Sequence, residues 1–483
     1  MGDAAFEPQP RSIGSRALRN TALLLTGRIT SRLLALVTVI ATARHLNDAG
    51  FGRFQTVVTY VALVSVLIDL GFNTLYTREA ARQPDQLARF LRNVLSTRLL
   101  FSVLGLVVLA GALAIPRLED LFLPAFAVML LSAYANVLRS TFYATGRLGY
   151  EAVAVVLESL LLLGLVLLGI VLNLGIAYFL WAYAIQYLFS CAYFAVVLQV
   201  TKMARFGWEF DLPLFREWFW KALPFALTFV LTTIYFKIDV PILQVFRPFT
   251  EVGWYSLAYK PIEAILFLPS TIFNVVFPVL SIYFHREPER LPRAINQFYR
   301  ALLGLGWPIT VGVVLLTTGI SELFRLYPQS EIALQILGSG IFLMFVTNAF
   351  IGALNAMDRQ VLFTWAAFIS LIINVGLNLI LIPPFGYLGS AWATDLTELA
   401  LLAVCWVFLA RQGHRVPLHR LSWRILVAGL VMGLALLPMR SFHGLLVLVA
   451  ILVGVAVYGV ALLLLRAVSR DEIAILRRAL VRH

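Results

Sequence analysis

The sequence predicts an all-α membrane protein with about fourteen transmembrane helices. The first reason is composition: of 483 residues, 61% are hydrophobic and 13% are charged, which lies outside the range of soluble globular domains. The second reason is a series of continuous apolar runs, most of them near the roughly 20 residues that a helix needs to cross a bilayer. The third is the uneven distribution of Lys and Arg between these runs. A β-barrel is not expected, because its spans alternate apolar and polar residues.

The apolar runs can be placed in order along the chain. The thirteenth is the weakest, because its apolar core is short and Pro438 closes it; thirteen full spans, or a partly submerged helix at this place, would also fit. Prolines in other spans are tolerated where neighbouring helices satisfy the freed backbone groups. The predicted spans are 21–43, 54–76, 95–115, 121–145, 150–172, 175–199, 222–245, 253–281, 300–320, 332–356, 361–382, 387–410, 424–439 and 444–465.

The positively charged residues indicate the orientation. The two tails and the even-numbered connections hold 26 Lys and Arg residues, and the odd-numbered connections hold 6. Positive residues collect on the cytoplasmic side, so we expect a multi-pass protein of the cytoplasmic membrane with both termini in the cytoplasm. The net charge of +13 is then mainly a feature of topology. It is spread over many short loops, so a nucleic-acid partner is not expected.

This topology can be tested with reporter fusions. A reporter fused after Arg205, between the sixth and seventh spans, should be active as a cytoplasmic reporter, and one fused after Pro248 should report the opposite side. The expected pattern follows from the 26 to 6 asymmetry. The reverse pattern at both positions would contradict the orientation and the assignment of spans.

An internal repeat relates the two halves of the chain. Two short patterns recur six spans apart with the same spacing, one closing spans four and ten and the other opening spans six and twelve. An even number of spans per repeat makes the two copies parallel, related by an axis along the membrane normal. The residues are Asn136, Ala144 and Arg147 against Asn348, Ala356 and Arg359, and Gly175, Trp181 and Ala182 against Gly386, Trp392 and Ala393.

The repeat predicts two six-helix lobes and an added helix pair. The C-terminal segment has apolar residues between arginines, as in a helix that lies on an anionic membrane surface. The expected parts are a cytoplasmic tail (1–20), an N-lobe of spans one to six (21–199), a cytoplasmic linker (200–221), a C-lobe of spans seven to twelve (222–410), spans thirteen and fourteen (411–466) and an amphipathic cytoplasmic tail (467–483).

The chain resembles the polysaccharide transporters of the multidrug/oligosaccharidyl-lipid/polysaccharide exporter superfamily. The resemblance rests on the number of spans, the internal repeat, the run Ala43 to Gly52 and the run Gly253 to Lys260. The resemblance covers nearly the whole chain. It implies a MATE-like fold of two lobes with alternating access, and a flippase that moves undecaprenyl-pyrophosphate-linked oligosaccharides from the cytoplasmic to the outer leaflet. Expected partners are that lipid-linked substrate, membrane lipids and other polysaccharide-assembly proteins.

Charged residues inside the spans are the candidate substrate site. Arg28 and Arg32 share one face of span one, and Lys260 on span eight is a candidate partner. Arginine suits a pyrophosphate because its charge is permanent and its planar fork can hold two oxygens. Arg98 and Arg139 lie nearer the ends of their spans and are expected to reach the interface.

Carboxylates and amides inside the spans are further candidates. Asp395 and Glu398 share a helical face, and like charges at short distance raise the pKa of one of them; these two, with Asp69 and Glu263, are the candidate sites for proton or sodium coupling. Glu263 is also a candidate counter-ion of Lys260. Interhelical hydrogen bonding is an equal alternative for the polar residues of span eleven, where the candidate sugar contacts are Ser370, Asn374 and Asn378.

Two other functions stay open. An ion-coupled multidrug antiporter of the same superfamily would need an acidic cavity for cationic drugs, and Arg28, Arg32 and Lys260 disfavour it. A membrane polymerase or ligase would need a large outer loop, yet the predicted outer loops have at most about a dozen residues, so no enzyme is expected. No metal centre or cofactor is expected either, because the six histidines and two cysteines are scattered.

Overall fold

The structure is a computed structural model that describes residues 10–203 and 207–467, with side chains from residue 26 onward. All regular elements in these ranges are helices. The predicted cytoplasmic tail (1–20) lies outside the described side chains. The predicted amphipathic tail (467–483) lies outside the described residues apart from Ala467, as do residues 204–206 of the predicted linker.

The number of spans agrees with the prediction. In the described ranges, thirteen helical segments are long and apolar enough to cross a membrane. The first of them, Thr26–Asp69, contains two of the predicted spans, because the backbone of α1 (Pro10–Asp69) breaks at Asn47 with φ 58° and ψ 176°. The questioned thirteenth run is long enough as well, since α17 already begins at Leu418 and the segment Leu418–Met439 has 22 residues.

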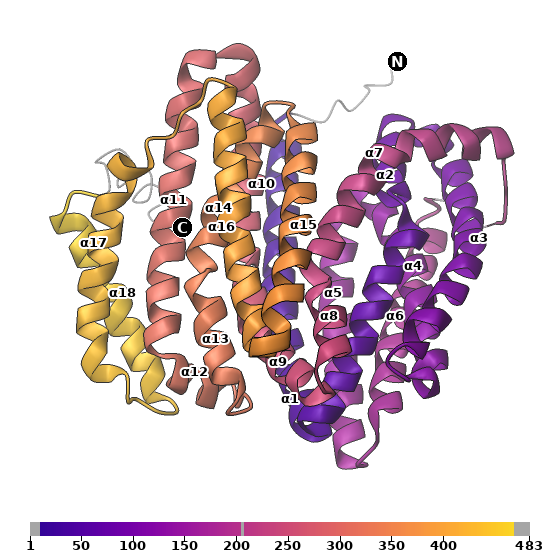
Figure 1. Cartoon of the computed structure of the whole chain (residues 1–483). Coiled ribbons are helices and arrows are strands. Elements are labelled where there is room, and N and C mark those ends of the chain that lie inside the picture. The colour runs from indigo at the N-terminus through magenta and orange to yellow at the C-terminus, as the bar shows by residue number, and fades with distance from the viewer. Residues whose placement is uncertain (1–9, 204–206, 468–483) are drawn as a thin grey trace. The chain divides into compact units, whose positions relative to one another are not determined.

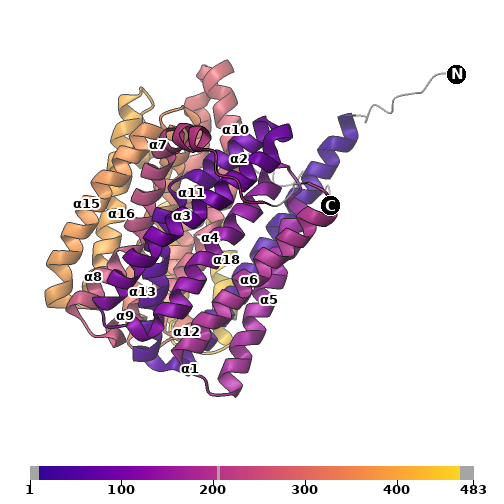
Figure 2. The same ribbon diagram turned by 90° about the vertical axis from the view of Figure 1, so that its right-hand side faces the viewer.

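Contacts between helices divide the chain after Lys237 into two compact units. In the first unit α1 packs along α5 and α3, and α4 packs on α6 (Figure 2). The elements of this unit are α1, α2 (Phe72–Arg82), η1 (Pro84–Gln86), α3 (Leu87–Ala114), η2 (Glu119–Leu121), α4 (Phe122–Ala144), α5 (Leu148–Val171), α6 (Ile176–Val200) and α7 (Leu212–Lys237). The predicted lobe limits stay a prediction.

In the second unit α15 packs along α16, α14 packs on α11 and α16, and the last two helices pack on each other and on α11 (Figure 1). Its elements are α8 (Asp239–Phe246), α9 (Phe249–Ile265), α10 (Phe267–Arg286), η3 (Pro288–Arg290), α11 (Leu291–Leu315), α12 (Thr317–Leu323), α13 (Ser330–Ser339), α14 (Ile341–Ala356), α15 (Gln360–Phe385), α16 (Tyr387–Arg411), α17 (Leu418–Leu436), η4 (Leu437–Met439) and α18 (Leu446–Leu464).

The sequence repeat corresponds to a repeated helix end. α4 ends at Ala144, Gly146 takes a left-handed conformation (φ 67°), and Arg147 precedes the next helix. The amide of Arg147 donates to the carbonyl five residues earlier at 3.0 Å, and the second copy has the same bond at 2.9 Å, as in a Schellman-type helix end. The residues of the second copy are Ala356, Asp358 (φ 58°) and Arg359.

Ionic contacts anchor the described part of the predicted linker to α3. Arg89 donates to Asp211 at 2.5 Å, and Arg92 donates to Glu209 at 2.8 Å. Asp211 also accepts the amide of Leu214 at 3.1 Å and so caps the start of α7. The hydrogen bond from Arg89 lowers the pKa of the Asp211 carboxyl below its usual value. The connection into α7 is therefore held by two arginines in the first turns of α3.

Candidate functional site

In the first unit, α1 carries two exposed arginines, Arg28 and Arg32, one helical turn apart. The helix approaches α5 closely at this level. A Cβ on Gly27 would lie 3.0 Å from the carbonyl oxygen of Ala152, so only glycine allows this contact without a shift. One turn further on, the hydroxyls of Ser31 and Ser159 are 2.6 Å apart. These small residues set the distance between α1 and α5, and with it the place of both arginines.

Arg28 is held by a chain of hydrogen bonds that leads into the helix bundle. Its Nη2 donates to the hydroxyl of Tyr143 at 2.5 Å, and its guanidinium lies 5.8 Å from the centre of the same ring. The Tyr143 hydroxyl in turn donates to Glu151 at 2.8 Å. Glu151 is 1% exposed. A buried carboxylate on α5 thus orients an exposed cation on α1 through a tyrosine on α4.

Arg139 completes the network at the contact between α4 and α5. Its Nη2 donates to both carboxylate oxygens of Glu158 at 2.7 Å, and its Nε lies 3.1 Å from Glu151. Two carboxylates, two turns apart on α5, thus hold Arg139 between the helices, and its expected position at the membrane interface stays a prediction. The charges of this network add up to zero, because it holds two arginines, Arg28 and Arg139, and two glutamates, Glu151 and Glu158.

Arg98 is more deeply buried than Arg139, which corrects the expectation that Arg98 reaches the interface. Its side chain is 2% exposed and donates to Asp69 and to the carbonyl of Ile68. Asp69 was a candidate for ion coupling. Its position beside a permanently charged guanidinium gives it a counter-ion within its own unit, which favours a structural role.

Arg32 differs from these buried cations. Among the residues that the structure describes, it has no hydrogen-bond or ion-pair partner. An unpaired cation in the middle of a membrane costs roughly 3 kcal/mol on insertion scales, so it is retained where it faces water or a ligand. Arg32 therefore presents an uncompensated positive charge next to a second arginine, Arg28, whose orientation is fixed by Tyr143.

Lys260 belongs to the second unit, on α9. It donates to Glu263 at 2.8 Å, and the two side chains are 13% and 31% exposed. This is the local ion pair that the spacing in the sequence allowed. A joint site of Lys260 with Arg28 and Arg32 stays a prediction.

A second polar centre surrounds Asp239, at the start of α8. The carboxylate is 6% exposed and accepts hydrogen bonds from Tyr255 at 2.8 Å, from Asn378 at 2.9 Å and from Thr394 at 3.1 Å. Ser390 donates to the side-chain oxygen of Asn378 at 3.0 Å. Each of these hydrogen-bond partners is a neutral side chain.

The Asp239 centre could hold a cation. Its side chains supply oxygen atoms from one carboxylate, two amides and hydroxyls, which hard cations prefer as ligands. A single carboxylate suits a monovalent ion or a proton better than a divalent ion, because burial of excess charge is costly. Among the described residues, no group of three or more His, Cys, Asp and Glu residues could hold a metal ion.

The predicted sugar contacts of span eleven lie in or beside this centre. Ser370, Asn374 and Asn378 are at most 2% exposed, and Asn378 also donates to Asn374. Their burial favours the interhelical alternative. Of the coupling candidates on α16, Asp395 is 6% exposed and accepts from Ser339 at 2.8 Å, and Glu398 is 4% exposed.

Two functional candidates, Tyr143 and Glu151, were missed in the sequence. Asp239 was recognised as a carboxylate within a span, but its hydrogen-bond partners were not foreseen. Glu151 was overlooked because it lies at the very start of a predicted span. The spacing of seven residues between Glu151 and Glu158 places both on one helical face, and it could have identified them as joint partners of an arginine. Asp239 could have been linked to the paired polar residues of α15 and α16, which recur every four positions.

Comparisons with known proteins agree with this architecture. A model of the polysaccharide biosynthesis protein family matches residues 17–284, more than half of the chain. A model of the lipid II flippase MurJ matches residues 256–468. A curated relative is the probable low-salt glycan biosynthesis flippase Agl15 of Haloferax volcanii, 25% identical over 169 residues. The alignment spans 34% of this chain and only 35% of that relative.

Solved structures show the same fold. The inward closed conformation of the lipid II flippase MurJ aligns with a TM-score of 0.72 at 16% identity, over 91% of this chain and 98% of that one. An inward-facing MATE-family multidrug resistance transporter aligns with a TM-score of 0.62 at 14% identity, over 79% and 94% of the chains. At this identity the likeness establishes the fold.

The largely buried ion pair of Arg139 on α4 and Glu158 on α5 should contribute more to the stability of the fold than an exposed ion pair. Replacing Glu158 by Ala leaves Arg139 partly uncompensated, and breaking a buried ion pair costs about 3–5 kcal/mol. We expect a clearly lower unfolding temperature of the purified protein in detergent. Glu217→Ala is the matched control, because Glu217 pairs with Lys221 and the two side chains are 54% and 50% exposed. Equal unfolding temperatures for both variants would contradict the structural role of Arg139.

Proposed function

We propose that this chain, which belongs to the polysaccharide biosynthesis protein family, is a flippase for polyprenyl-pyrophosphate-linked oligosaccharides. The family acts on lipid-linked substrates in membranes, and the chain is a multi-pass membrane protein. The proposed substrate carries undecaprenyl pyrophosphate and a polysaccharide repeat unit. The proposed location is the cytoplasmic membrane, with both termini in the cytoplasm. Movement runs from the cytoplasmic to the outer leaflet by alternating access.

The observation that carries this proposal is the cationic face of α1. Arg32 is exposed without a partner in the described residues, and Arg28 beside it is oriented by Tyr143. A pyrophosphate offers several anionic oxygens, and guanidinium groups bind such oxygens through short charge-assisted hydrogen bonds. A hydrocarbon tail can stay in lipid while the headgroup crosses. The negative charge of the substrate thus matches the positive charge of Arg32, which no described side chain compensates.

Tyr143 and Glu151 have the role of positioning residues in this proposal. An arginine side chain has many rotamers, and fixing them before the ligand binds reduces the entropy lost on binding. The tyrosine occupies one Nη of Arg28 and leaves the remaining N–H groups for the pyrophosphate. Glu151 offsets the charge of Arg28 only in part, because it also lies beside Arg139.

Transport against a gradient needs an energy source, and we propose coupling to a sodium ion or a proton at Asp239. Its carboxylate is buried among neutral oxygen-bearing side chains, so binding of a cation would neutralise it. Asp69 and Glu263 are weaker candidates, because each lies beside a cation. Asp395 and Glu398 stay candidates on α16. Other polysaccharide-assembly proteins are expected to supply and use the substrate.

A multidrug antiporter of the same superfamily is the alternative. Its fold is shared, as the MATE-family structure shows, so the fold does not decide between the two functions. The positive charge on α1 favours the flippase over the antiporter, because Arg28 and Arg32 would repel a cationic drug. An enzymatic role as polymerase or ligase has no support from the geometry, and the relatives named above are flippases and transporters.

Reconstituted vesicles provide the direct test. A fluorescent glycolipid with a pyrophosphate link should become accessible to a membrane-impermeant quencher from the opposite leaflet at a rate that depends on the protein. Arg28→Ala and Arg32→Ala should each lower this rate at least about tenfold, since a charge-assisted hydrogen bond contributes about 1.5–3 kcal/mol. Lysine at position 32 should restore part of the rate, because it keeps the charge without the fork.

The matched control is Arg290→Ala, which removes an exposed arginine of η3 that pairs with Glu287, just before α11 begins. It should flip the glycolipid at the rate of the unchanged protein. A double Arg28→Ala, Arg32→Ala variant with full activity would disprove the proposed site. Vesicles that export ethidium but leave the glycolipid in its leaflet would show that the antiporter is the correct function.

A further inference from the structure

A basic cavity lies in the second unit, where α16 ends and α17 begins. Its volume is about 650 Å³, and its lining combines two arginines and a histidine with apolar side chains. Its lining includes none of the residues assigned to transport above. The lining residues are Trp406, Val407, Ala410, Arg411, Arg415, Val416, Pro417, Leu418 and His419.

We propose that this cavity binds the phosphate headgroup of an anionic phospholipid of the surrounding membrane. The first argument is charge. The lining contains no Asp or Glu, and among the described residues Arg411, Arg415 and His419 have no ion-pair or hydrogen-bond partner. Three basic side chains around one cavity attract an anion, and guanidinium groups match a phosphate in shape.

The second argument is position along the membrane normal. α16 belongs to the candidate span Tyr387–Arg411, and α17 opens the candidate span Leu418–Met439. The cavity therefore lies where two spans meet the water interface, the depth of lipid phosphates. Basic pockets between transmembrane helices at this depth are the usual form of anionic headgroup sites. On the proposed topology this is the cytoplasmic leaflet.

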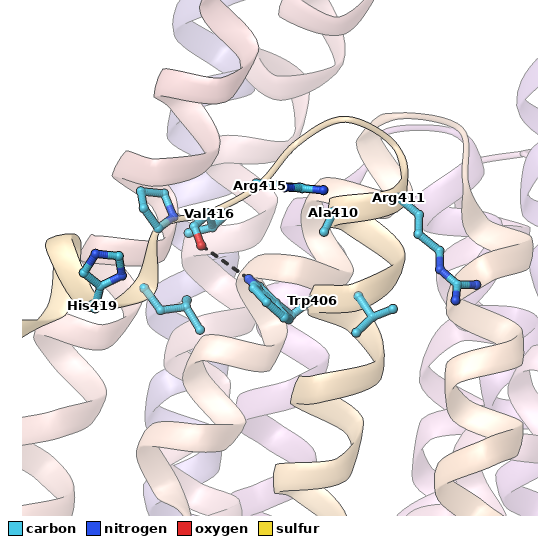
Figure 3. A pocket seen from close by; sticks show the side chains of 9 residues that line it. Trp406, Ala410, Arg411, Arg415, Val416 and His419 are labelled. Atoms are coloured by element: carbon cyan, nitrogen blue, oxygen red, sulfur yellow. Dashed lines mark hydrogen bonds between the residues drawn. The ribbon is translucent and has the colours of Figure 1, made fainter.

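The third argument is that the backbone around the open cavity is fixed by a hydrogen bond across it. The indole Nε1 of Trp406 donates to the carbonyl of Val416 at 3.3 Å, so the connection is tied across the end of α16. Val416 is 3% exposed. Arg411 lies to one side of Trp406 and His419 to the other, while Arg415 lies on the connection above the indole (Figure 3). Cationic groups thus stand at the rim, and the indole with its apolar neighbours forms the floor.

The apolar lining distinguishes a lipid from a dissolved anion. Trp406, Val407, Pro417 and Leu418 offer contact surface that inorganic phosphate could not use, whereas the glycerol and the first methylene groups of a phospholipid could. Trp423, on the first turns of α17, is 50% exposed and stacks with the guanidinium of Arg424 at 5.3 Å. Aromatic and basic residues of this kind mark the headgroup level. An anionic phospholipid is therefore the occupant that fits both parts of the lining.

The test uses the purified full chain in detergent micelles. Binding of phosphatidylglycerol is measured by native mass spectrometry over a range of lipid concentrations. An Arg411→Ala, Arg415→Ala double variant should have a dissociation constant for this lipid at least about tenfold higher than the unchanged protein. The binding of zwitterionic phosphatidylcholine should be the same for both proteins.

Arg420→Ala is the matched control. Arg420 lies on the same segment and is exposed, but it does not line the cavity. It should leave the dissociation constant within about twofold of the unchanged value, because diffuse attraction is screened within a Debye length. An equal loss in Arg420→Ala would show unspecific attraction and overturn the proposal.

Competition with glycerol 3-phosphate distinguishes a site for a phospholipid headgroup from a site for a soluble phosphate anion. At millimolar concentration it should fail to displace phosphatidylglycerol; full displacement would identify a site for a soluble anion and contradict the lipid assignment. If the double variant does not fold, Arg415→Gln alone should raise the dissociation constant at least about threefold. Unchanged lipid binding in a folded variant would exclude the site. These results do not depend on the proposed flippase activity, since the glycolipid assay measures Arg28 and Arg32.

Discussion

The contact between α4 and α5 is the interaction on which the candidate site of the first unit depends. Arg139 is held by Glu158 and lies beside Glu151, and Glu151 reaches Arg28 on α1 through Tyr143. Two carboxylates on one helix face thus serve two arginines on different helices. Because charge at this depth is costly unless it is paired, the ionic network determines both how the helices pack and which cation is left over.

The architecture could be predicted from sequence because its physical causes are local in the chain. Apolar length and loop charge mark the spans, and the repeated Asn, Ala and Arg pattern corresponds to the same left-handed helix end in both copies, at Gly146 and Asp358. The break of α1 at Asn47 also agrees with two separate spans. These features need no knowledge of which helix packs against which.

The partners of the charged residues could not be predicted in the same way, because they come from distant parts of the chain. Arg98 was expected at the interface and is buried beside Asp69, 29 positions earlier. Asn378 was a candidate for sugar contact or for interhelical bonding, and its partner Asp239, 139 positions earlier, could not be identified from the sequence. Depth in the membrane and helix rotation decide such pairs, and periodicity alone does not specify either. The pair of Lys260 and Glu263 could be predicted, because both residues lie one turn apart on the same helix.

The central claim is that α1 presents a water-accessible cationic surface at Arg32. It can be measured directly in a protein whose two native cysteines, Cys191 and Cys405, are replaced and whose Arg32 is changed to Cys, with Arg28 kept. We expect a negatively charged thiol reagent to label Cys at position 32 faster than a positively charged reagent of the same size, because Arg28 attracts the anion. A cysteine at Leu33, which is 60% exposed on the apolar side of the same turn, should stay unlabelled. Faster labelling of position 32 by the positive reagent, or no labelling by either, would contradict a cationic anion-binding surface on this helix.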